Sequence, residues 1–483
     1  MQFAVVLRIL GILLMAFSLA MLPPILVSYL YQDQETHAFI TAFAMMALLG
    51  LGLWLPARGR AGEMHVRDGF MVVGMLWTVA CLIGALPFIL SHHPHMSLTD
   101  AVFETVSGLT TTGATVLLGL DRLPASILFY RAELHWLGGM GIIVLAVAVL
   151  PMLGIGGMQL FRAETSGPIK DNKLTPRIKE TAKLLWLVYL WITVACLLAF
   201  WAAGMTFFDA LLHAFSAVST GGFSSHDDSL GYFKSPLIEG IAIFFMIVSG
   251  ANFTLHYLVW NKADLKWYWQ DAELRTYLLV LLVVSLLASY YLFTRAVYTD
   301  PLEALRAGTF QAVSIITSTG FTTVDIAAWP SFVGILLILA SFIGGCAGST
   351  AGGIKVIRFL LLIKQGVREV RKVIHPRAEI PIRVGRTRIE PRVIEAVWGF
   401  FALYMASFTL MYLALAFTGI DLITAFTAVA AMMNNMGPGL GSVSATCAHL
   451  EPAAKWILSF AMLLGRLEVF TLLVLFSPAY WRW

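Results

Sequence analysis

The stretch "FETVSGLTTTGAT" at residues 103–115 decides the fold, because it returns three more times along the chain. The related stretches are "LHAFSAVSTGGFS" (212–224), "FQAVSIITSTGFT" (310–322) and "TAVAAMMNNMGPG" (427–439). A serine stands six residues before the central glycine in the first three copies, and an alanine takes its place in the fourth. Four matching copies indicate an internal repeat of one structural unit. The central glycines are Gly113, Gly222, Gly320 and Gly437.

The surroundings of these stretches are strongly apolar. The chain has 483 residues, of which 59% are hydrophobic and 12% are charged. A helix needs about 20 mostly apolar residues to cross a bilayer, and such windows recur along the whole sequence. The first window is longer than the core of a signal peptide, so we expect a retained helix there. The windows are 3–30, 37–57, 69–91, 126–153, 181–204, 235–260, 274–297, 330–343, 394–418 and 453–479.

Each repeat has the same predicted parts in the same order. A spanning helix is followed by an apolar segment of about ten residues, too short to cross a bilayer. The glycine stretch and a second spanning helix come next. Every short segment opens near an aspartate, which we expect to act as the helix N-cap. The C-terminal ends of these helices would then direct partial negative charge toward the glycine stretches, which favours a cation there. The aspartates are Asp100, Asp209, Asp300 and Asp421.

Two spanning helices per repeat give all four repeats the same orientation, so they can close around one axis. The sequence therefore predicts an all-α polytopic membrane protein with four parallel membrane–pore loop–membrane repeats. Two extra transmembrane helices precede them. We assign residues 1–68 to the two extra helices, and 69–178, 179–272, 273–392 and 393–483 to repeats 1 to 4.

The glycine stretches place polar, non-helical backbone at membrane depth. Such backbone must be buried in protein or line a watery cavity. Rings of backbone carbonyls replace the hydration shell of K⁺, and glycine permits the positive φ that lets successive carbonyls face one way. The stretches are therefore interpreted as the lining of an ion path. The alternative is close helix packing, for which small residues are also used.

The basic residues predict the topology. With a cytoplasmic N-terminus, 25 of the 32 Lys and Arg fall on the inner side, so both termini are expected in the cytoplasm. The inner loops 154–183 and 355–395 hold most of them. Nucleic-acid binding by this basic region is not expected, since a segment between two spans is more often a topology signal or a docking surface.

Two features break the symmetry of the repeats. The stretch "IGGCAGSTAGGIK" (343–355) is too rich in glycine for a continuous helix, so we expect an intramembrane loop over 344–353 that acts as a gate. A flexible kink is the alternative. Arg466 lies in an apolar segment, where a cation is costly and usually functional. We expect it to face the pore, although a structural pair between helices is the alternative. Lys355 is expected to extend to the cytoplasmic interface.

These motifs resemble a known family. "TTTGA", "STGGF", "TSTGF" and "NNMGPG", together with "GGCAGSTAGGIK" and "GRLEVFTLLVLF", are similar to the Trk/Ktr/HKT superfamily of potassium transporters, most of all to the bacterial TrkH-type membrane subunit. The resemblance implies K⁺ uptake across the bacterial inner membrane, a homodimer and regulation by a cytoplasmic TrkA-type nucleotide-binding ring. No bound cofactor is implied, and K⁺ is the transported ion.

The resemblance also implies site residues. Glycine at the central position of every repeat goes with K⁺ permeation, and serine in the first repeat with Na⁺ preference. The implied gating residues are Arg466, Lys355, Gly344, Gly345, Gly348, Gly352 and Gly353. The implied filter is Thr110, Thr111, Thr112, Gly113, Thr220, Gly221, Gly222, Ser318, Thr319, Gly320, Asn435, Met436 and Gly437, with K⁺ held at Thr111, Thr112, Thr220, Gly221, Ser318, Thr319, Asn435 and Met436.

Several other functions stay open or are excluded by the residues. Alternating-access carriers often use inverted repeats, whereas these repeats are parallel. Coupling of K⁺ to Na⁺ or H⁺, or a less selective K⁺/Na⁺ path, remains an alternative. An enzyme is not expected, because HExxH and GxSxG motifs are absent. "HHPH" (92–95) is expected to be a solvated loop rather than a metal site, and four scattered cysteines predict no disulfide framework. The acids Glu104, Asp121, Asp227 and Asp228 are candidates for attracting cations to the pore mouth.

Overall fold

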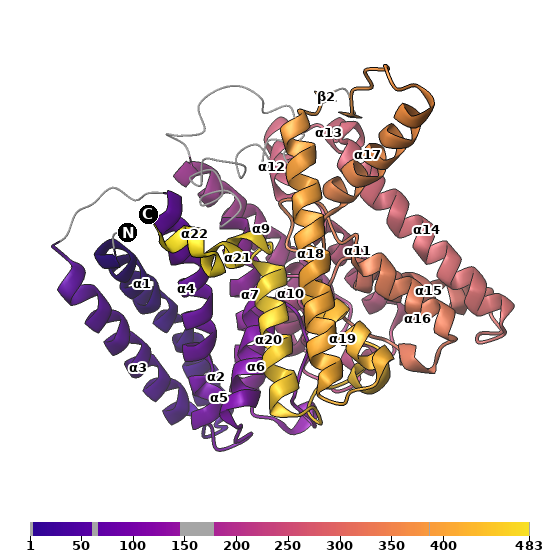
Figure 1. Cartoon of the computed structure of the whole chain (residues 1–483). Coiled ribbons are helices and arrows are strands. Elements are labelled where there is room, and N and C mark those ends of the chain that lie inside the picture. The colour runs from indigo at the N-terminus through magenta and orange to yellow at the C-terminus, as the bar shows by residue number, and fades with distance from the viewer. Residues whose placement is uncertain (1–2, 60–65, 145–177, 386, 483) are drawn as a thin grey trace.

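The computed structural model describes residues 3–59, 66–144, 178–385 and 387–482, which are mostly helical (Figure 1). Six helical segments in these ranges are long and apolar enough to cross a membrane, or eight if each of two sharply bent helix pairs counts as one span. The polytopic helical architecture is thus confirmed. The end of the window predicted at 126–153 and most of the inner loop predicted at 154–183 lie outside the described residues.

A helix pair precedes the repeats. Helix α1 (Phe3–Ser18) passes through the short turn η1 (Leu19–Met21) into α2 (Leu22–Tyr31), and α3 (Thr36–Trp54), followed by η2 (Leu55–Ala57), packs along α1. The two backbones touch through glycine, since a Cβ on Gly11 would lie 2.6 Å from the carbonyl oxygen of Gly50. The pair lies at one edge of the molecule (Figure 1).

Repeats 1 and 2 show the predicted order of elements. Repeat 1 has a first helix α4 (Val66–Gly84) that is extended by α5 (Leu86–Leu90), a pore helix α6 (Leu98–Leu109) and a second helix α7 (Ala125–Val144). Repeat 2 has α9 (Ile178–Ala202), the pore helix α10 (Phe207–Val218) and a second helix in two pieces, α11 (Pro236–Ser249) and α12 (Phe253–Lys262), followed by α13 (Lys266–Gln270).

Repeats 3 and 4 have the same order. Repeat 3 consists of α14 (Ala272–Thr294), the pore helix α15 (Pro301–Ile316), α16 (Ser331–Ser341) and α17 (Val356–Ile374). Repeat 4 consists of α18 (Pro391–Phe417), the pore helix α19 (Leu422–Met433), α20 (Pro452–Arg466), α21 (Phe470–Phe476) and the short α22 (Pro478–Trp481). The loops on the side predicted to face outward, called the outer loops, contain the turns η3 (Leu120–Arg122), η6 (Ser229–Phe233), η7 (Ile326–Ala328) and η8 (Gly441–Val443).

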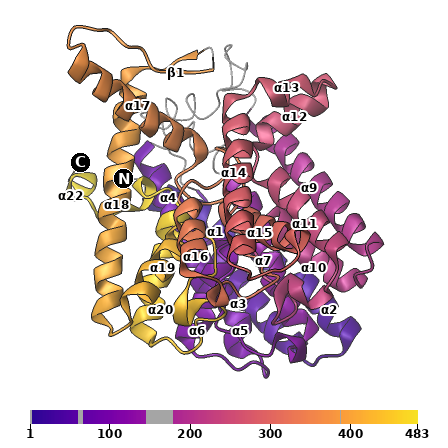
Figure 2. The same ribbon diagram turned by 90° about the vertical axis from the view of Figure 1, so that its right-hand side faces the viewer.

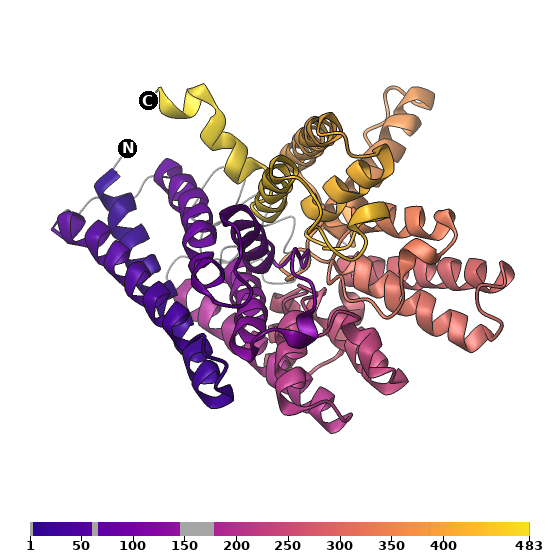
Figure 3. The ribbon, with the colours of Figure 1, turned by 90° about the horizontal axis from the view of Figure 1, so that it is seen from below.

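The four repeats form a closed ring. The pore helix of each repeat packs against the second helix of the preceding repeat: α10 on α7, α15 on α11, α19 on α16 and, closing the circle, α6 on α20. Seen from below, the repeats follow one another around a centre in chain order (Figure 3). The residue bounds that we assigned to the repeats stay a prediction.

The pore helices begin differently from the prediction in two repeats. Asp300 and Asp421 are the N-caps of α15 and α19, as expected. In repeats 1 and 2 the cap is a hydroxyl residue three positions earlier. Ser97 accepts from the Asp100 N–H at 3.2 Å and donates its hydroxyl to the Asp100 carboxylate at 2.8 Å. Thr206 and Asp209 repeat this arrangement. These aspartates therefore stand at the third helical position and hold the hydroxyl of the N-cap residue in place.

The second helices are interrupted in more repeats than the glycine run indicated. Helix α16 ends at Ser341 and α17 begins at Val356, as the run at 344–353 predicts. The windows 235–260 and 453–479, expected to be continuous, also break: α11 and α12 meet at 93°, and α20 and α21 at 117°. In repeat 2 the freed Gly250 carbonyl accepts a hydrogen bond from the Cys346 N–H at 2.8 Å. The loop of repeat 3 thus satisfies backbone that the break leaves unpaired.

A small hairpin was not predicted. Strands β1 (Arg383–Val384) and β2 (Thr387–Arg388) pair antiparallel between α17 and α18. Their apolar side chains join those of the first turns of α17 and α18 in a separate cluster, which includes Ile357, Leu361, Val384 and Val393. Helix α17 and β1 project from the body of the protein at its upper end (Figure 2). No other strand occurs among the described residues.

Candidate functional site

The four pore helices end in the same backbone turn. The residue after the C-cap has a left-handed φ, and the following N–H bonds back to the carbonyl five residues earlier, as when the Thr112 N–H donates to the Ser107 carbonyl at 2.9 Å. This is the Schellman arrangement, which turns the chain sharply out of the helix. The glycine stretches are therefore extended segments that begin where the pore helices end. The left-handed residues are Thr111, Thr220, Ser318 and Asn435, with φ of 52°, 52°, 54° and 50°.

The central glycines hold the four segments against one another. Their φ values lie between 82° and 88°, a region that L side chains rarely adopt. A Cβ on Gly113 would overlap the carbonyl oxygen of Gly221 in repeat 2. A Cβ on Gly222 would likewise meet the Thr319 carbonyl oxygen, and one on Gly320 would meet that of Met436. A Cβ on Gly437 would meet the carbonyl oxygen of Thr112, so repeat 4 contacts repeat 1 and the ring closes. The structure thus brings all four stretches together in a ring, including "NNMGPG", the least similar in sequence.

The four segments at the central glycines (110–113, 219–222, 317–320 and 434–437) are called the filter segments after the role predicted for them. Their side chains mostly bond to protein. The hydroxyls of Thr110 and Thr112 lie 2.7 Å apart, and those of Thr317 and Thr319 lie 2.8 Å apart. Asn435 donates from Nδ2 to the Thr112 hydroxyl at 3.0 Å and so joins repeat 4 to repeat 1. Because the side chains brace the backbone, the peptide carbonyls are the groups left to bind a cation, and carbonyl oxygens are the usual ligands of K⁺ in filters.

A cavity of about 440 Å³ opens on the outer side of the ring. All four central glycines line it, together with the outer loops of every repeat. Asp227, Asp228 and Asp325 are in its wall, as are Lys234 and Arg131. Asp227 and Asp228, two of the four acids that the sequence offered as attractors of cations, therefore line this cavity. Asp121 and Glu104 do not: each is engaged by a basic side chain.

His226 joins the outer loops of repeats 1 and 2. Its Nδ1 lies 2.5 Å from Oδ1 of Asp121, and its Nε2 lies 3.4 Å from Oδ1 of Asp209. Burial of the ring opposes protonation, but hydrogen bonds to Asp209 and Asp121 outweigh it, so the pKa of His226 is raised. The imidazole also stacks on Tyr232, with ring centroids 3.6 Å apart. The sequence analysis did not single out this residue.

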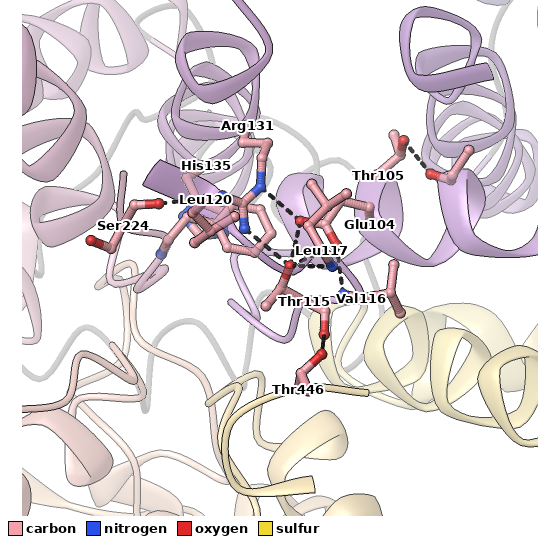
Figure 4. Close-up of polar contacts among 12 residues, drawn as sticks. Glu104, Thr105, Thr115, Val116, Leu117, Leu120, Arg131, His135, Ser224 and Thr446 are labelled. Carbon is pink, nitrogen blue, oxygen red and sulfur yellow. Dashed lines mark hydrogen bonds and ion pairs between the residues drawn. The ribbon is translucent and has the colours of Figure 1, made fainter. Parts of the chain in front are cut away.

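Behind the first filter segment lies a buried ion pair that the sequence analysis missed (Figure 4). Arg131 Nε donates to Glu104 at 2.8 Å, and both side chains are almost wholly buried, at 1% and 0% exposure. Glu104 also accepts from the Thr115 hydroxyl at 2.9 Å and the Val116 N–H at 2.9 Å. The sequence did contain a signal for this pair. Glu104 and Arg131 are opposite charges in neighbouring apolar helices, and such charges usually pair with one another.

The loop between α16 and α17 lies against the inner ends of the pore helices. The Thr350 hydroxyl donates to the carbonyls of Val218 at 3.1 Å and Ser249 at 3.2 Å, both in repeat 2. The Gly352 N–H donates to the Ser318 hydroxyl at 2.5 Å. A Cβ on Gly352 would overlap the carbonyl oxygen of Asn434 in repeat 4. The loop is therefore in contact with the segments of repeats 2, 3 and 4 at once.

The other glycines of the loop shape its fold. Gly344, Gly348 and Gly353 have φ of 69°, 69° and 79°. Gly344 and Gly353 lie against each other, so that a Cβ on Gly353 would come 2.8 Å from the Cα of Gly344. A Cβ on Gly345 would lie 2.9 Å from the carbonyl oxygen of Gly250 in repeat 2.

Arg466 connects this loop to repeats 1 and 4. It is 3% exposed and lies at the end of α20. Its Nη1 donates to the Thr350 carbonyl at 2.9 Å and its Nη2 to the Gly138 carbonyl at 3.4 Å. Glu468 does not partner it, since that carboxylate accepts from Arg358 at 2.6 Å. Lys355 does not extend to an interface as expected: it is buried and bonds to the Ala351 carbonyl within the loop.

Two minor expectations concern metal and sulfur. Within the described residues, no group of three or more His, Cys, Asp or Glu side chains could hold a metal ion. The N–H groups of His92 and His93 donate to the Glu35 carboxylate at 3.0 and 2.9 Å, which fixes this outer loop. The four cysteines are buried and free, as expected.

Comparisons with known proteins agree with this geometry. The sequence profile of the TrkH family, described as "Cation transport protein", matches residues 35–483. The "Trk system potassium uptake protein TrkH" of Vibrio parahaemolyticus is 51% identical over the full length of both chains, and the protein of that name from Escherichia coli K12 is also 51% identical over both. The crystal structure of "the Potassium Transporter TrkH from Vibrio parahaemolyticus" superimposes with a TM-score of 0.93 at 49% identity, covering 100% of each chain. The chain therefore belongs to the TrkH family of cation transport proteins.

Proposed function

We propose that this chain carries K⁺ into a bacterial cell through a pore whose filter is the ring of carbonyls at the four central glycines. The observation that carries the proposal is the closure of that ring, in which each glycine lies against a carbonyl oxygen of the next repeat. The names of the full-length relatives, which are potassium uptake proteins, support K⁺ as the ion. The C-terminal ends of four pore helices add partial negative charge on the same side of the ring.

Glycine in every repeat supports a preference for K⁺ over Na⁺. A larger residue at 113 would have to displace the Gly221 carbonyl, because a Cβ would overlap it. A ring that is disturbed in one quarter no longer offers K⁺ the same number of oxygens at the same spacing. The ligands in this proposal are the carbonyls of Thr111, Thr112, Thr220, Gly221, Ser318, Thr319, Asn435 and Met436.

The loop over 344–353 and Arg466 are proposed as the gate. The loop contacts the segments of three repeats, and Arg466 fastens it to the fourth repeat and to the Gly138 carbonyl of the first. A guanidinium held here also repels cations that have passed the filter. Opening would require the loop to leave these contacts.

The regulatory partner is proposed to be a cytoplasmic TrkA-type nucleotide-binding ring, and the protein is proposed to be a homodimer in the inner membrane with both termini cytoplasmic. The α17–β1–β2 projection offers a basic surface to such a partner, since Arg371 and Arg377 are exposed there. Val373 and Ile374 are exposed between them. The inner loop predicted at 154–183 is a second candidate docking segment, and most of it lies outside the described residues.

Ion flux in liposomes tests the proposal. The purified chain is reconstituted with and without the ring, and uptake of radiolabelled Rb⁺ and Na⁺ is measured against empty liposomes. We expect Rb⁺ uptake that exceeds Na⁺ uptake and a reversal potential that follows the K⁺ gradient alone. A reversal potential that shifts with an imposed pH or Na⁺ gradient would instead favour an alternative, either coupled symport or a less selective path. Equal Na⁺ and Rb⁺ uptake would refute the filter.

A further inference from the structure

In each repeat a side chain of the pore helix contacts the residues directly after the central glycine. These residues are called the outgoing arm of the filter segment. The position lies nine residues before the central glycine and is Glu104, His213, Gln311 or Ala428 in repeats 1 to 4. Glu104 accepts from the Thr115 hydroxyl, His213 Nε2 lies 2.9 Å from the Ser224 hydroxyl, and Gln311 Nε2 lies 3.5 Å from the Thr323 hydroxyl. In repeat 4 the preceding Thr427 takes over and accepts from the Leu440 N–H at 3.0 Å.

The supporting side chain in repeat 1, Glu104, differs from those of the other repeats because it belongs to an ion pair. Three donor groups make four contacts with the Glu104 carboxylate: the Arg131 Nε, the Val116 N–H and the Thr115 hydroxyl, which lies close to both oxygens. A buried carboxylate with this many donors is held in one orientation. The arm that follows Gly113 is therefore fixed to its own pore helix by the strongest contacts of the four repeats.

Arg131 extends this support to repeat 2. Its Nη2 donates to the Thr115 hydroxyl at 3.1 Å, and its Nη1 reaches the Ser224 carbonyl at 3.2 Å. The guanidinium carbon lies 4.2 Å from the centre of the Phe223 ring, directly after the central glycine of repeat 2. One planar cation thus contacts the outgoing arms of two neighbouring repeats. Lysine could not do this, because it offers a single point charge.

Repeat 4 joins at the same place. The Thr115 carbonyl accepts from the Cys447 N–H at 2.8 Å and from the Thr446 hydroxyl at 3.2 Å (Figure 4). Thr115 is therefore the meeting point of three repeats: its side chain belongs to the ion pair, and its carbonyl bonds to the outer loop of the fourth. A shift of the Glu104–Arg131 pair would therefore move the carbonyl ring at two of its four junctions, those of repeat 1 with repeat 2 and with repeat 4.

We propose that the Glu104–Arg131 pair determines ion specificity by positioning: it holds the junctions of repeat 1 with repeats 2 and 4 so that the carbonyl ring keeps its spacing. The proposal rests on the proposed function of the ring as a K⁺ filter. Carbonyls favour K⁺ over Na⁺ only while they keep their number and distance, and a smaller ion is admitted when they can move inward. The pair acts through Thr115 and Ser224 and does not itself touch the ion.

Three variants test this inference in reconstituted liposomes. Glu104→Gln removes the charge but keeps the shape, and Thr115→Val removes only the hydroxyl that both charged groups share. Lys455→Gln is the matched control, because Lys455 pairs with Asp100 at 2.6 Å on the same helix α6, but at its outer end. We expect the K⁺/Na⁺ permeability ratio to fall roughly tenfold in the first two variants and to stay unchanged in the control.

The outcomes separate the inference from the proposed function. If the unmodified chain prefers K⁺ but Glu104→Gln and Thr115→Val keep its ratio, the pair is only structural and the inference is wrong. An equal fall in Lys455→Gln overturns it as well, because the effect is then not specific to this pair. If Glu104→Gln does not fold, Thr115→Val decides alone. Absence of K⁺ preference in the unmodified chain is a failure of the filter itself.

Discussion

The guanidinium of Arg466 donates a hydrogen bond to the carbonyl of Thr350 at 2.9 Å, although the two residues are 116 positions apart in the chain. The contact places the only cation at the end of α20 against the loop that interrupts repeat 3. It also makes the position of that loop depend on repeat 4. The relationship suggests the first prediction.

Replacing Arg466 by alanine is expected to raise K⁺ flux. The change removes the hydrogen bond from a charged donor to the Thr350 carbonyl of the loop, worth about 1.5–3 kcal/mol, so flux should rise roughly tenfold or more if this bond holds the loop closed. Flux through proteoliposomes measures the effect, with Lys455→Gln as a control that removes an outer cation. Unchanged flux in Arg466→Ala and in a deletion within 344–353 would contradict the gate.

Gly113→Ser is expected to reduce the preference for K⁺. The new Cβ would overlap the Gly221 carbonyl, so the neighbouring segment must move. We expect the K⁺/Na⁺ permeability ratio to fall about tenfold, equivalent to about 1.4 kcal/mol. Gly119→Ser is a suitable control, because that glycine also has a positive φ of 68° but its Cβ would meet open space. A preserved ratio in Gly113→Ser would show that this position does not set the ion preference.

The outer loop contact at His226 is expected to depend on pH. Its pKa is raised, because hydrogen bonds to Asp209 and Asp121 outweigh the opposing effect of burial. The stabilisation is therefore complete below the unfolded pKa of about 6.5 and is lost as pH rises through the higher folded value. Hydrogen exchange of residues 223–233 at external pH 5.5 to 8.5 measures it. His226→Gln should remove the pH dependence, and an identical profile in that variant would assign the effect to another group.

Glu468→Gln is expected to destabilise the break between α20 and α21. Glu468 pairs with Arg358 at 2.6 Å, and Arg358 also lies over the Phe400 ring at 4.3 Å. Removal of the carboxylate charge weakens the pairing of a buried cation, which costs about 3–5 kcal/mol in fully buried pairs and less here, since Glu468 is one-third exposed. Thermal unfolding in detergent measures the loss. Glu369→Gln, at an exposed pair with Lys372, should leave the transition unchanged.

Local sequence was sufficient for the repeated architecture. The spacing of glycine after a short capped helix recurs four times, and each copy folds into the same turn, so the pattern could be read without contacts. Even "NNMGPG" was found by register, and its Gly437 has the expected positive φ.

Tertiary contacts explain what the sequence did not reveal. The bend at Gly250 depends on a hydrogen bond from Cys346, about a hundred residues away, and a window of apolar letters contains no sign of it. Glu104 was considered at the pore mouth because nothing local indicates that Arg131 lies within 2.8 Å of it. Lys355 is buried for a similar reason: the loop folds back so that its own Ala351 carbonyl receives the ammonium.

A single polypeptide supplies all four quarters of this pore, and that has a consequence for how it can vary. A channel built from four identical subunits must carry any change in every quadrant at once. Here the support behind the quadrants is a carboxylate, an imidazole, an amide and a hydroxyl group, at Glu104, His213, Gln311 and Thr427. Each quadrant can therefore be tuned alone, while the glycine that they share stays constrained by its neighbour's oxygen.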